Sequence, residues 1–134
     1  MRIIALDVGK RRIGIAVSDP LGVTARPYST IERDRHAPEK ITVLVRELQV
    51  GKILVGLPLH LDGSEGTQAQ DVRRFAAKLA EAATLVPIEF RDERLTTVEA
   101  QQRLSDRHRN LRKNKKKIDA VAACILLEEY LLER

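Results

Sequence analysis

Cysteine and aromatic residues are scarce in this sequence of 134 residues, and each shortage excludes a class of protein. The single cysteine, Cys124, rules out an internal disulfide and a zinc site built from several cysteines. With no tryptophan, two tyrosines and two phenylalanines, the chain has little material for an aromatic platform that stacks single-stranded bases. The longest uncharged apolar stretch, Ala120–Leu127, is far shorter than the roughly 20 residues of a membrane-spanning helix.

Targeting and nucleotide-binding signals are also missing. The chain does not open with the basic-then-apolar pattern of a signal segment, and it contains neither a Walker motif nor a G-x-G-x-x-G motif. Its three histidines are scattered and lack the spacing of zinc ligands. We therefore expect a soluble, cytoplasmic protein with one domain over residues 1–134, since one domain usually takes about 100–200 residues.

Positive charge is concentrated in one segment of the sequence. The whole chain has 24 Lys and Arg against 19 Asp and Glu, which gives a formal charge of +5. Residues 107–117 contain seven of these cations and no acid, so the rest of the chain carries 17 − 19 = −2. A concentrated basic segment indicates contact with a polyanion, and nucleic acid phosphates are the expected partner. The alternative is a solvated loop without a partner.

Short apolar runs bounded by turn residues predict five strands. Ile3–Val8 and Ile13–Val17 are joined by only four residues, which is typical of an antiparallel hairpin. A weaker third strand is expected around Tyr28–Ile31. Lys52–Leu57 is an apolar run of the buried type, and Val86–Arg91 is expected to form the last strand.

Apolar residues at helical spacing predict the helices. The first covers Ile41–Leu48, where apolar residues recur at i, i+3, i+4 and i+7, and Gly51 is expected to end it. Three further helices are expected: Ala69–Ala83, a short helix from Thr96 or Thr97 toward Leu104, and a largely buried Ile118–Leu132. Strands that alternate with helices indicate parallel pairing with right-handed crossovers. The predicted fold is α/β: a mixed five-stranded sheet with antiparallel opening strands, a parallel remainder and helices on both faces.

Three acidic residues occupy positions where a charge is unfavourable or where functional sites gather. Asp7 interrupts an apolar strand, and an ionised carboxylate there needs compensation by something positive. Asp119 is the only charge in the first ten residues of the mostly buried last helix. Glu93 follows the last strand, and ligands bind at the carboxyl ends of strands in open α/β sheets. Together these acids predict a shared site.

Each acid also has a purely structural explanation. Asp7 could end a hairpin strand, Asp119 could favour the positive end of a helix dipole, and Glu93 could pair with a neighbouring arginine. The combination with a basic segment favours a metal site instead, because Mg²⁺ is bound by carboxylates, phosphate oxygens and water. Two ions held by such carboxylates would activate water and stabilise the oxygens of an in-line displacement at phosphorus. The pattern therefore predicts a phosphodiesterase.

Four sequence blocks resemble the YqgF/RuvX family, and together they extend over essentially the whole chain. The blocks are Ala5–Gly9 continued by Arg12–Asp19, Val55–Leu59 with Asp62–Gly66, Asp92–Thr97, and Lys117–Ala123. Any one block alone would be a weak signal, but four in the same order are specific. The resemblance implies an RNase H-like fold related to the RuvC resolvases. It also implies a bacterial nuclease that matures the 5′ end of pre-16S ribosomal RNA.

The resemblance further implies which residues carry the chemistry. Asp7, Glu93 and Asp119 would be the catalytic and metal-binding residues, with Mg²⁺ or Mn²⁺ as the cofactor, and Asp62 or Glu65 is the alternative to Glu93. Candidate phosphate contacts are Arg11, Arg12, Lys113, Lys115, Lys116 and Lys117. His60 stands where the family pattern leads us to expect a small amide, and it is a candidate for substrate contact without a role as metal ligand.

Two other functions remain open at this point. The same chemistry could act on DNA, as in a Holliday junction resolvase that works on recombination intermediates. A non-catalytic RNA-binding factor with structural acids is the second alternative. An actin-like ATP-binding domain shares the D-x-G opening but normally needs two lobes, which 134 residues do not supply. The sequence leaves open RNA against DNA, exonuclease against endonuclease, and monomer against homodimer.

Overall fold

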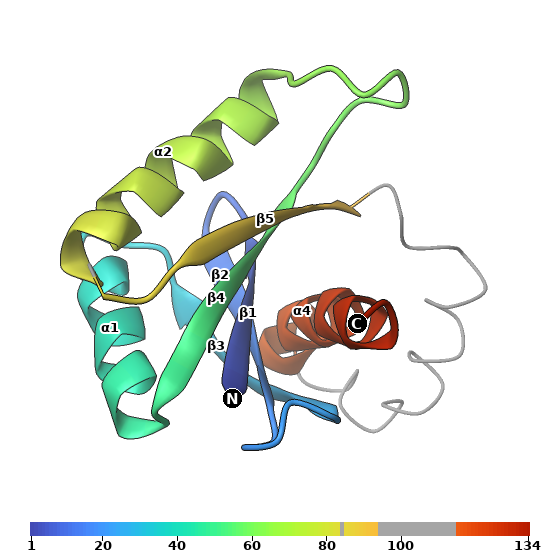
Figure 1. Ribbon diagram of the computed structural model, residues 1–134. Helices are drawn as coiled ribbons and strands as arrows, with labels where there is room; N and C mark the ends of the chain where they lie inside the picture. Colours follow the sequence, from blue (N-terminus) through green and yellow to red (C-terminus); the bar gives the residue numbers. More distant parts are fainter. Residues whose placement is uncertain (84, 94–114) are drawn as a thin grey trace.

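The computed structural model describes residues 1–83, 85–93 and 115–134, and for residues 115–119 it describes the backbone alone. Five strands and three helices make up this part of the chain (Figure 1). They are β1 (Arg2–Val8), β2 (Arg12–Ser18), β3 (Ala25–Glu32), α1 (Ala37–Glu47), β4 (Val50–Leu57), α2 (Thr67–Ala82), β5 (Ile88–Asp92) and α4 (Lys115–Leu132). None of the helices in these ranges has the length and apolar character that would let it cross a membrane.

The strands form one mixed sheet with the order β3-β2-β1-β4-β5. β1 pairs antiparallel with β2, and β2 pairs antiparallel with β3. β1 and β4 are parallel, as are β4 and β5. The predicted mixed five-stranded sheet, with antiparallel opening strands and a parallel remainder, is therefore confirmed.

Helices cover both faces of the sheet, as predicted (Figure 1). α1 and α2 pack together over one face, and α4 lies across the other. Because side chains alternate along a strand, β1 contributes to both layers. Its even-numbered residues from Ile4 to Val8 belong to the core under α1 and α2, whereas Ile3 and Ala5 belong to the core under α4. By the same alternation, the side chain of Asp7 points to the α4 face.

The helices bury the stripes that their sequences predict. In α2 the buried residues recur every three or four positions, which places one apolar face against the sheet. They are Ala69, Val72, Phe75, Ala76 and Leu79. α4 packs on β1, β2 and β3 and buries Cys124, as expected for a core cysteine.

The end of the first helix differs from the prediction. We expected Gly51 to end it, but α1 ends at Glu47 and the left-handed residue is Gln49, with φ of 54°. Only two residues separate α1 from β4, so the turn must be completed before the strand begins. Gly51 lies inside β4, where a β-carbon would collide with the side chain of Met1. Its small size therefore serves packing against the amino terminus.

Other boundaries also differ from the predictions, and one helix lies outside the described residues. α1 begins at Ala37 rather than Ile41, and α4 begins at Lys115 rather than Ile118. β3 is longer than the predicted Tyr28–Ile31, because pairing along β2 extends it in both directions. β5 runs from Ile88 to Asp92 and begins two residues later than predicted. The short helix expected from Thr96 or Thr97 toward Leu104 falls within residues 94–114, which the structure does not describe.

Candidate active site

The carboxyl ends of β1, β4 and β5 meet at one edge of the sheet, because these three strands are parallel. Asp7 is the penultimate residue of β1, and Glu93 directly follows β5. β4 lies between these strands and brings Gly56, near its own carboxyl end, between the two acids. This edge is where ligand sites gather in open α/β sheets.

The side chains of Asp7 and Glu93 contact each other through a hydrogen bond. Burial raises the pKa of Glu93 to about 7, with further contributions from the charge and hydrogen bond of Asp7 and from the charge of Asp92. A hydrogen bond between two carboxyl groups requires a proton on one of them. With a pKa of about 7, Glu93 keeps that proton up to neutral pH.

Gly56 provides the space that Glu93 occupies. A β-carbon on Gly56 would lie 3.0 Å from the carboxyl carbon of Glu93 and 3.1 Å from its Cγ, and it would overlap Oε1. Any larger residue would push the carboxylate away from this position. In the sequence, Gly56 stands out only as part of the family block Val55–Leu59, and its role in leaving space for Glu93 was not predicted. The available signal was a glycine inside a buried strand, which often marks a close approach.

Arg91 anchors β5 two residues before Glu93. Its guanidinium donates two hydrogen bonds to Glu133, of 2.7 and 2.6 Å, although only 7% of the arginine is exposed. Glu133 directly follows α4, so this ion pair ties the edge strand to the end of that helix. A neighbouring arginine is the structural explanation offered above for Glu93, but the hydrogen bonds of Arg91 go to Glu133. The structure shows that it holds the strand in place through a different acid.

Asp119 lies in the first half of α4, the helix that covers the face to which Asp7 points. Its side chain is outside the described part of the structure, so its place beside Asp7 and Glu93 stays a prediction. The same holds for Lys115, Lys116 and Lys117, which occupy the first turn of α4, and Lys113 falls in the undescribed range. Among the side chains that are described, no group of three His, Cys, Asp or Glu residues could hold a metal ion.

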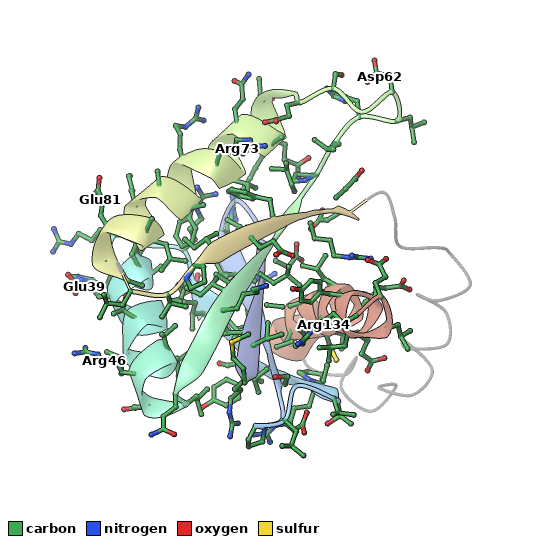
Figure 2. All side chains as sticks on the ribbon, viewed as in Figure 1. Glu39, Arg46, Asp62, Arg73, Glu81 and Arg134 are labelled. Atoms are coloured by element: carbon green, nitrogen blue, oxygen red, sulfur yellow. The ribbon has the colours of Figure 1, made fainter. Side chains whose placement is uncertain are left out.

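The alternative acids have other partners. Asp62 accepts hydrogen bonds from the backbone N–H and the hydroxyl of Ser64, at 2.9 and 2.7 Å. Figure 2 shows Asp62 at the tip of the loop between β4 and α2. Glu65 binds the guanidinium of Arg73 with two hydrogen bonds of 2.7 and 2.9 Å. The described contacts thus place Glu93, rather than either of these residues, beside Asp7.

His60 supports the fold of the same loop. Its imidazole lies over Gly66, where a β-carbon would collide with the ring. Its backbone N–H donates to the carbonyl of Ser64, and its carbonyl accepts from the N–H of Gly63, both at 2.9 Å. These contacts explain a structural use for His60 at the start of α2, and substrate contact stays a prediction.

The hairpin beside Asp7 presents cations. Gly9 N–H donates to the carbonyl of Arg12 at 2.9 Å and closes the turn, while Arg33 N–H donates to the carbonyl of Arg11 at 2.8 Å. A β-carbon on Gly9 would lie 2.8 Å from that Arg12 carbonyl oxygen, so the tight turn requires glycine here. Lys10 and Arg11 are exposed at the tip. Arg11 and Arg12, the predicted phosphate contacts, therefore lie in the turn and strand that come directly after Asp7 in the chain.

The chemistry of the pair fits a divalent cation. Carboxylate oxygens are the hard ligands that Mg²⁺ and Mn²⁺ prefer. The raised pKa of Glu93 shows that two negative charges at this place are unfavourable without compensation. A cation would supply that compensation, so the residues present suit the ion that the sequence predicts.

Comparisons with known proteins agree with this architecture. A family model described as "RuvX: Holliday junction resolvase" matches residues 1–133. A relative from Anaeromyxobacter sp. is 45% identical over 133 residues, covering 98% of this chain and 96% of its own. One from Chloroflexus aurantiacus is 47% identical over 133 residues, covering 96% and 85%. Both are named "Putative pre-16S rRNA nuclease".

Solved structures show the same fold at low sequence identity. Thermus thermophilus RuvC is 14% identical with a TM-score of 0.64, and the match covers 100% of this chain and 96% of RuvC. The fowlpox virus resolvase, solved with Holliday junction DNA, is 12% identical with a TM-score of 0.61 and coverages of 99% and 98%. The predicted RNase H-like fold is thereby confirmed. With a family model matched over nearly every residue and relatives above 40% identity, the chain belongs to the RuvX family, also called YqgF.

Proposed function

We propose that this chain is a nuclease that depends on Mg²⁺ or Mn²⁺ and matures the 5′ end of pre-16S ribosomal RNA. The observation that carries the proposal is the hydrogen-bonded pair of Asp7 and Glu93 at the carboxyl ends of parallel strands. The names of the relatives supply the substrate. The protein would work as one domain over residues 1–134 in the cytoplasm, as a monomer or a homodimer.

Asp7, Glu93 and Asp119 would hold the metal. A divalent ion bound there supplies Lewis acidity, which favours both an attacking water and the charged oxygens of a phosphodiester in displacement. A cation held there would favour the ionised form of both carboxylates, so Glu93 would give up the proton that its raised pKa lets it keep near neutral pH. Gly56 leaves room for Glu93 to remain beside Asp7, and Arg91 holds the strand that carries Glu93.

Cationic side chains would bind the nucleic acid beside the acids. Arg11 and Arg12 lie on the hairpin that follows Asp7, and Lys115, Lys116 and Lys117 lie on the first turn of α4. Together with Lys113 they would contact phosphates, which gives affinity that depends on salt but little on base sequence. Orientation of the scissile phosphate would then come from these cations and from the metal ligands.

A comparison of two substrates tests the proposal. Wild-type protein is incubated with unprocessed 16S ribosomal RNA and with a four-way DNA junction, in Mn²⁺ or in EDTA, and the product ends are mapped. We expect RNA cleavage that requires Mn²⁺. Asp7→Asn and Glu93→Gln should lose at least about 100-fold in rate, since metal stabilisation of the transition state is worth several kcal/mol. Asp62→Asn and Glu65→Gln are the matched controls and should remain active. Unchanged cleavage by Asp7→Asn would end the assignment.

A junction resolvase is the second candidate. It is favoured by the description of the family model and by the fold shared with RuvC. Paired cuts in the four-way DNA junction, with little cleavage of the ribosomal precursor, would select this function. A non-catalytic RNA-binding factor would instead bind RNA without cutting it and would show no carboxylate-dependent uptake of Mn²⁺ in calorimetry.

A further inference from the structure

A basic groove lies between the start of α1, with the residues just before it, and the middle of α2. It has a volume of about 470 Å³. Four cations and two acids lie in its lining, which gives a formal charge of 4 − 2 = +2. The sequence places the positive excess of the chain in residues 107–117, so this second basic surface was not predicted. The charged residues are Arg33, Arg35, Arg74, Lys78, Asp34 and Asp71. No role in the acidic site accounts for this groove.

Arg33 builds a rigid floor for the groove. Its guanidinium donates two hydrogen bonds to Asp71, of 2.7 and 3.0 Å, and one to the carbonyl of Gly9, at 3.0 Å. It also lies over the ring of Phe75, 5.3 Å from the ring centre. The hydrogen bonds from Arg33, followed by the charges of Arg74 and Lys10, lower the pKa of Asp71. The charge of Asp71 is thus already compensated within the protein.

The other three cations of the groove lack an ion pair as short as that of Arg33, so their positive charge is available to a ligand. Arg74 is 3.8 Å from Asp71, which already has two shorter contacts with Arg33, and 68% of its side chain is exposed. Arg35 donates a hydrogen bond to the imidazole of His36 at 3.3 Å and makes no ion pair among the described residues. Lys78 is exposed and has no ion pair within the described residues. Three cationic side chains therefore lie open at the groove, Arg35 beside the start of α1 and Arg74 and Lys78 on α2.

The groove and the acidic pair lie at the same edge of the sheet but on opposite faces. β3 ends beside the hairpin turn, because Arg12 is paired with Glu32, and α1 follows it there. The α1 and α2 face holds the groove, and the α4 face holds Asp7. The hairpin tip between them carries Lys10 and Arg11, and Lys10 is close enough to influence Asp71. A cationic path therefore runs around this edge from one face to the other.

We propose that this groove binds the phosphodiester backbone of the substrate nucleic acid at a distance from the bond that is cut. Backbone phosphates are repeated single negative charges, which suit separated and mobile cations on an open surface. Arg35, Arg74 and Lys78 would contact the part of the nucleic acid that continues past the hairpin tip. The proposal rests on the proposed function only for the identity of the nucleic acid as substrate.

A binding assay without metal tests the groove separately from cleavage. Affinity of the full chain for a labelled stem-loop of the 16S ribosomal RNA precursor is measured in EDTA over a series of salt concentrations. The test variant is Arg35→Ala/Arg74→Ala/Lys78→Ala. The control is Arg26→Ala/Arg46→Ala/Arg134→Ala, which removes the same charge from exposed positions outside the groove. Figure 2 shows Arg46 and Arg134 at a distance from α2.

We expect the groove variant to bind at least about tenfold more weakly, with a salt slope flatter by about two to three units. The control variant should bind nearly as wild type. Acetylation of wild-type Lys78 by a lysine reagent should also slow when RNA is bound, a readout that needs no variant. Equal RNA binding by both variants, or acetylation of Lys78 that RNA does not slow, would overturn the proposed role of the groove. Metal-dependent cleavage by wild type would in that case leave the proposed function intact. If wild type showed no metal-dependent cleavage, but the groove variant bound RNA more weakly and RNA protected Lys78, only the proposed function would be overturned.

Discussion

Two carboxyl groups from distant parts of the chain share a partly buried position, and two negative charges there are unfavourable in the protein alone. Asp7 comes from the first strand and Glu93 from the segment after the last strand. Burial and the neighbouring charges of Asp7 and Asp92 raise the pKa of Glu93 to about 7. Perturbed acids of this kind cluster at functional sites, because a ligand supplies the compensation that the fold leaves out. The ionised pair thus costs stability in the protein alone.

Replacing Glu93 with glutamine should change how stability depends on pH. The pKa of a glutamate is near 4.5 in an unfolded chain and about 7 in this fold. Between these values the folded state binds more protons, so the wild type loses stability as pH rises through this window. Glu93→Gln should be flatter between pH 5 and 8 and more stable than wild type at pH 8. Urea unfolding in EDTA measures this, with Glu81→Gln as the exposed control on α2. The same pH slope in wild type and Glu93→Gln would contradict the prediction.

Replacing Gly56 with alanine should displace Glu93. The added methyl group would collide with the carboxyl group, so we expect a cost of about 1–3 kcal/mol in the free energy of unfolding. In a Glu93→Ala background the same change should cost little, because the collision is removed. A double-mutant cycle by urea unfolding isolates this coupling. Gly51→Ala is the comparison, since its new methyl group meets only the flexible side chain of Met1. Equal costs in both backgrounds would show that Gly56 serves another contact.

At the scale of elements, hydrophobic periodicity predicted most of what the structure contains. The hairpin, α1, α2 and the buried strand β4 are recognisable because their apolar residues follow a period of two or about 3.6, or form a continuous run. Asp7 stood out for the same reason, as a charge inside an apolar strand. The predicted end of α1 was wrong. In the sequence Gly51 resembles a helix stop, but tertiary contact with Met1 explains why a glycine stands at this position. Gly56 gives a local signal of a close approach, as a glycine inside a buried strand, but its partner Glu93 becomes known only when folding brings the two strands together.

The connection between β5 and the end of α4 is a second feature that only the structure reveals. Arg91 is buried, while its partner Glu133 has a side chain that is 54% exposed. Glu133→Gln should therefore lower the free energy of unfolding by more than substitution of an unpaired surface glutamate does, because it leaves the buried Arg91 guanidinium with a weaker partner. Urea unfolding at neutral pH measures the cost, with Glu81→Gln again as the control. The Arg91 hydrogen bonds lower the pKa of Glu133 from its ordinary value of 4.5, so the difference from wild type should shrink as pH falls through the range below that value. A change no larger than that of the control would contradict the anchoring role.

At the scale of the whole molecule, opposite charges are separated across one edge of the sheet. The acidic pair faces α4, the basic groove lies beside α1 and α2, and the hairpin turn connects the two faces. The parallel strands produce this arrangement, because their carboxyl ends gather polar residues from distant parts of the chain. A mixed sheet adds the hairpin at the same edge, so cations follow directly after Asp7 in sequence and in space. An anionic polymer can therefore be bound beside acids that would otherwise repel it.

Metal binding should stabilise the whole fold, and more strongly at higher pH. A ligand that binds only the native state adds RT ln(1 + [L]/Kd) to stability, about 2.7 kcal/mol at 100 times the Kd. Mn²⁺ and a proton compete for the pair of Asp7 and Glu93, and Glu93 releases its proton near pH 7. The rise in melting temperature with Mn²⁺ should therefore be larger at pH 8 than at pH 6, and EDTA should reverse it. Asp7→Asn should remove most of this stabilisation, whereas Asp62→Asn should keep it, since Asp62 is exposed and bound to Ser64. A Mn²⁺ effect that survives Asp7→Asn would place the bound ion elsewhere in the protein.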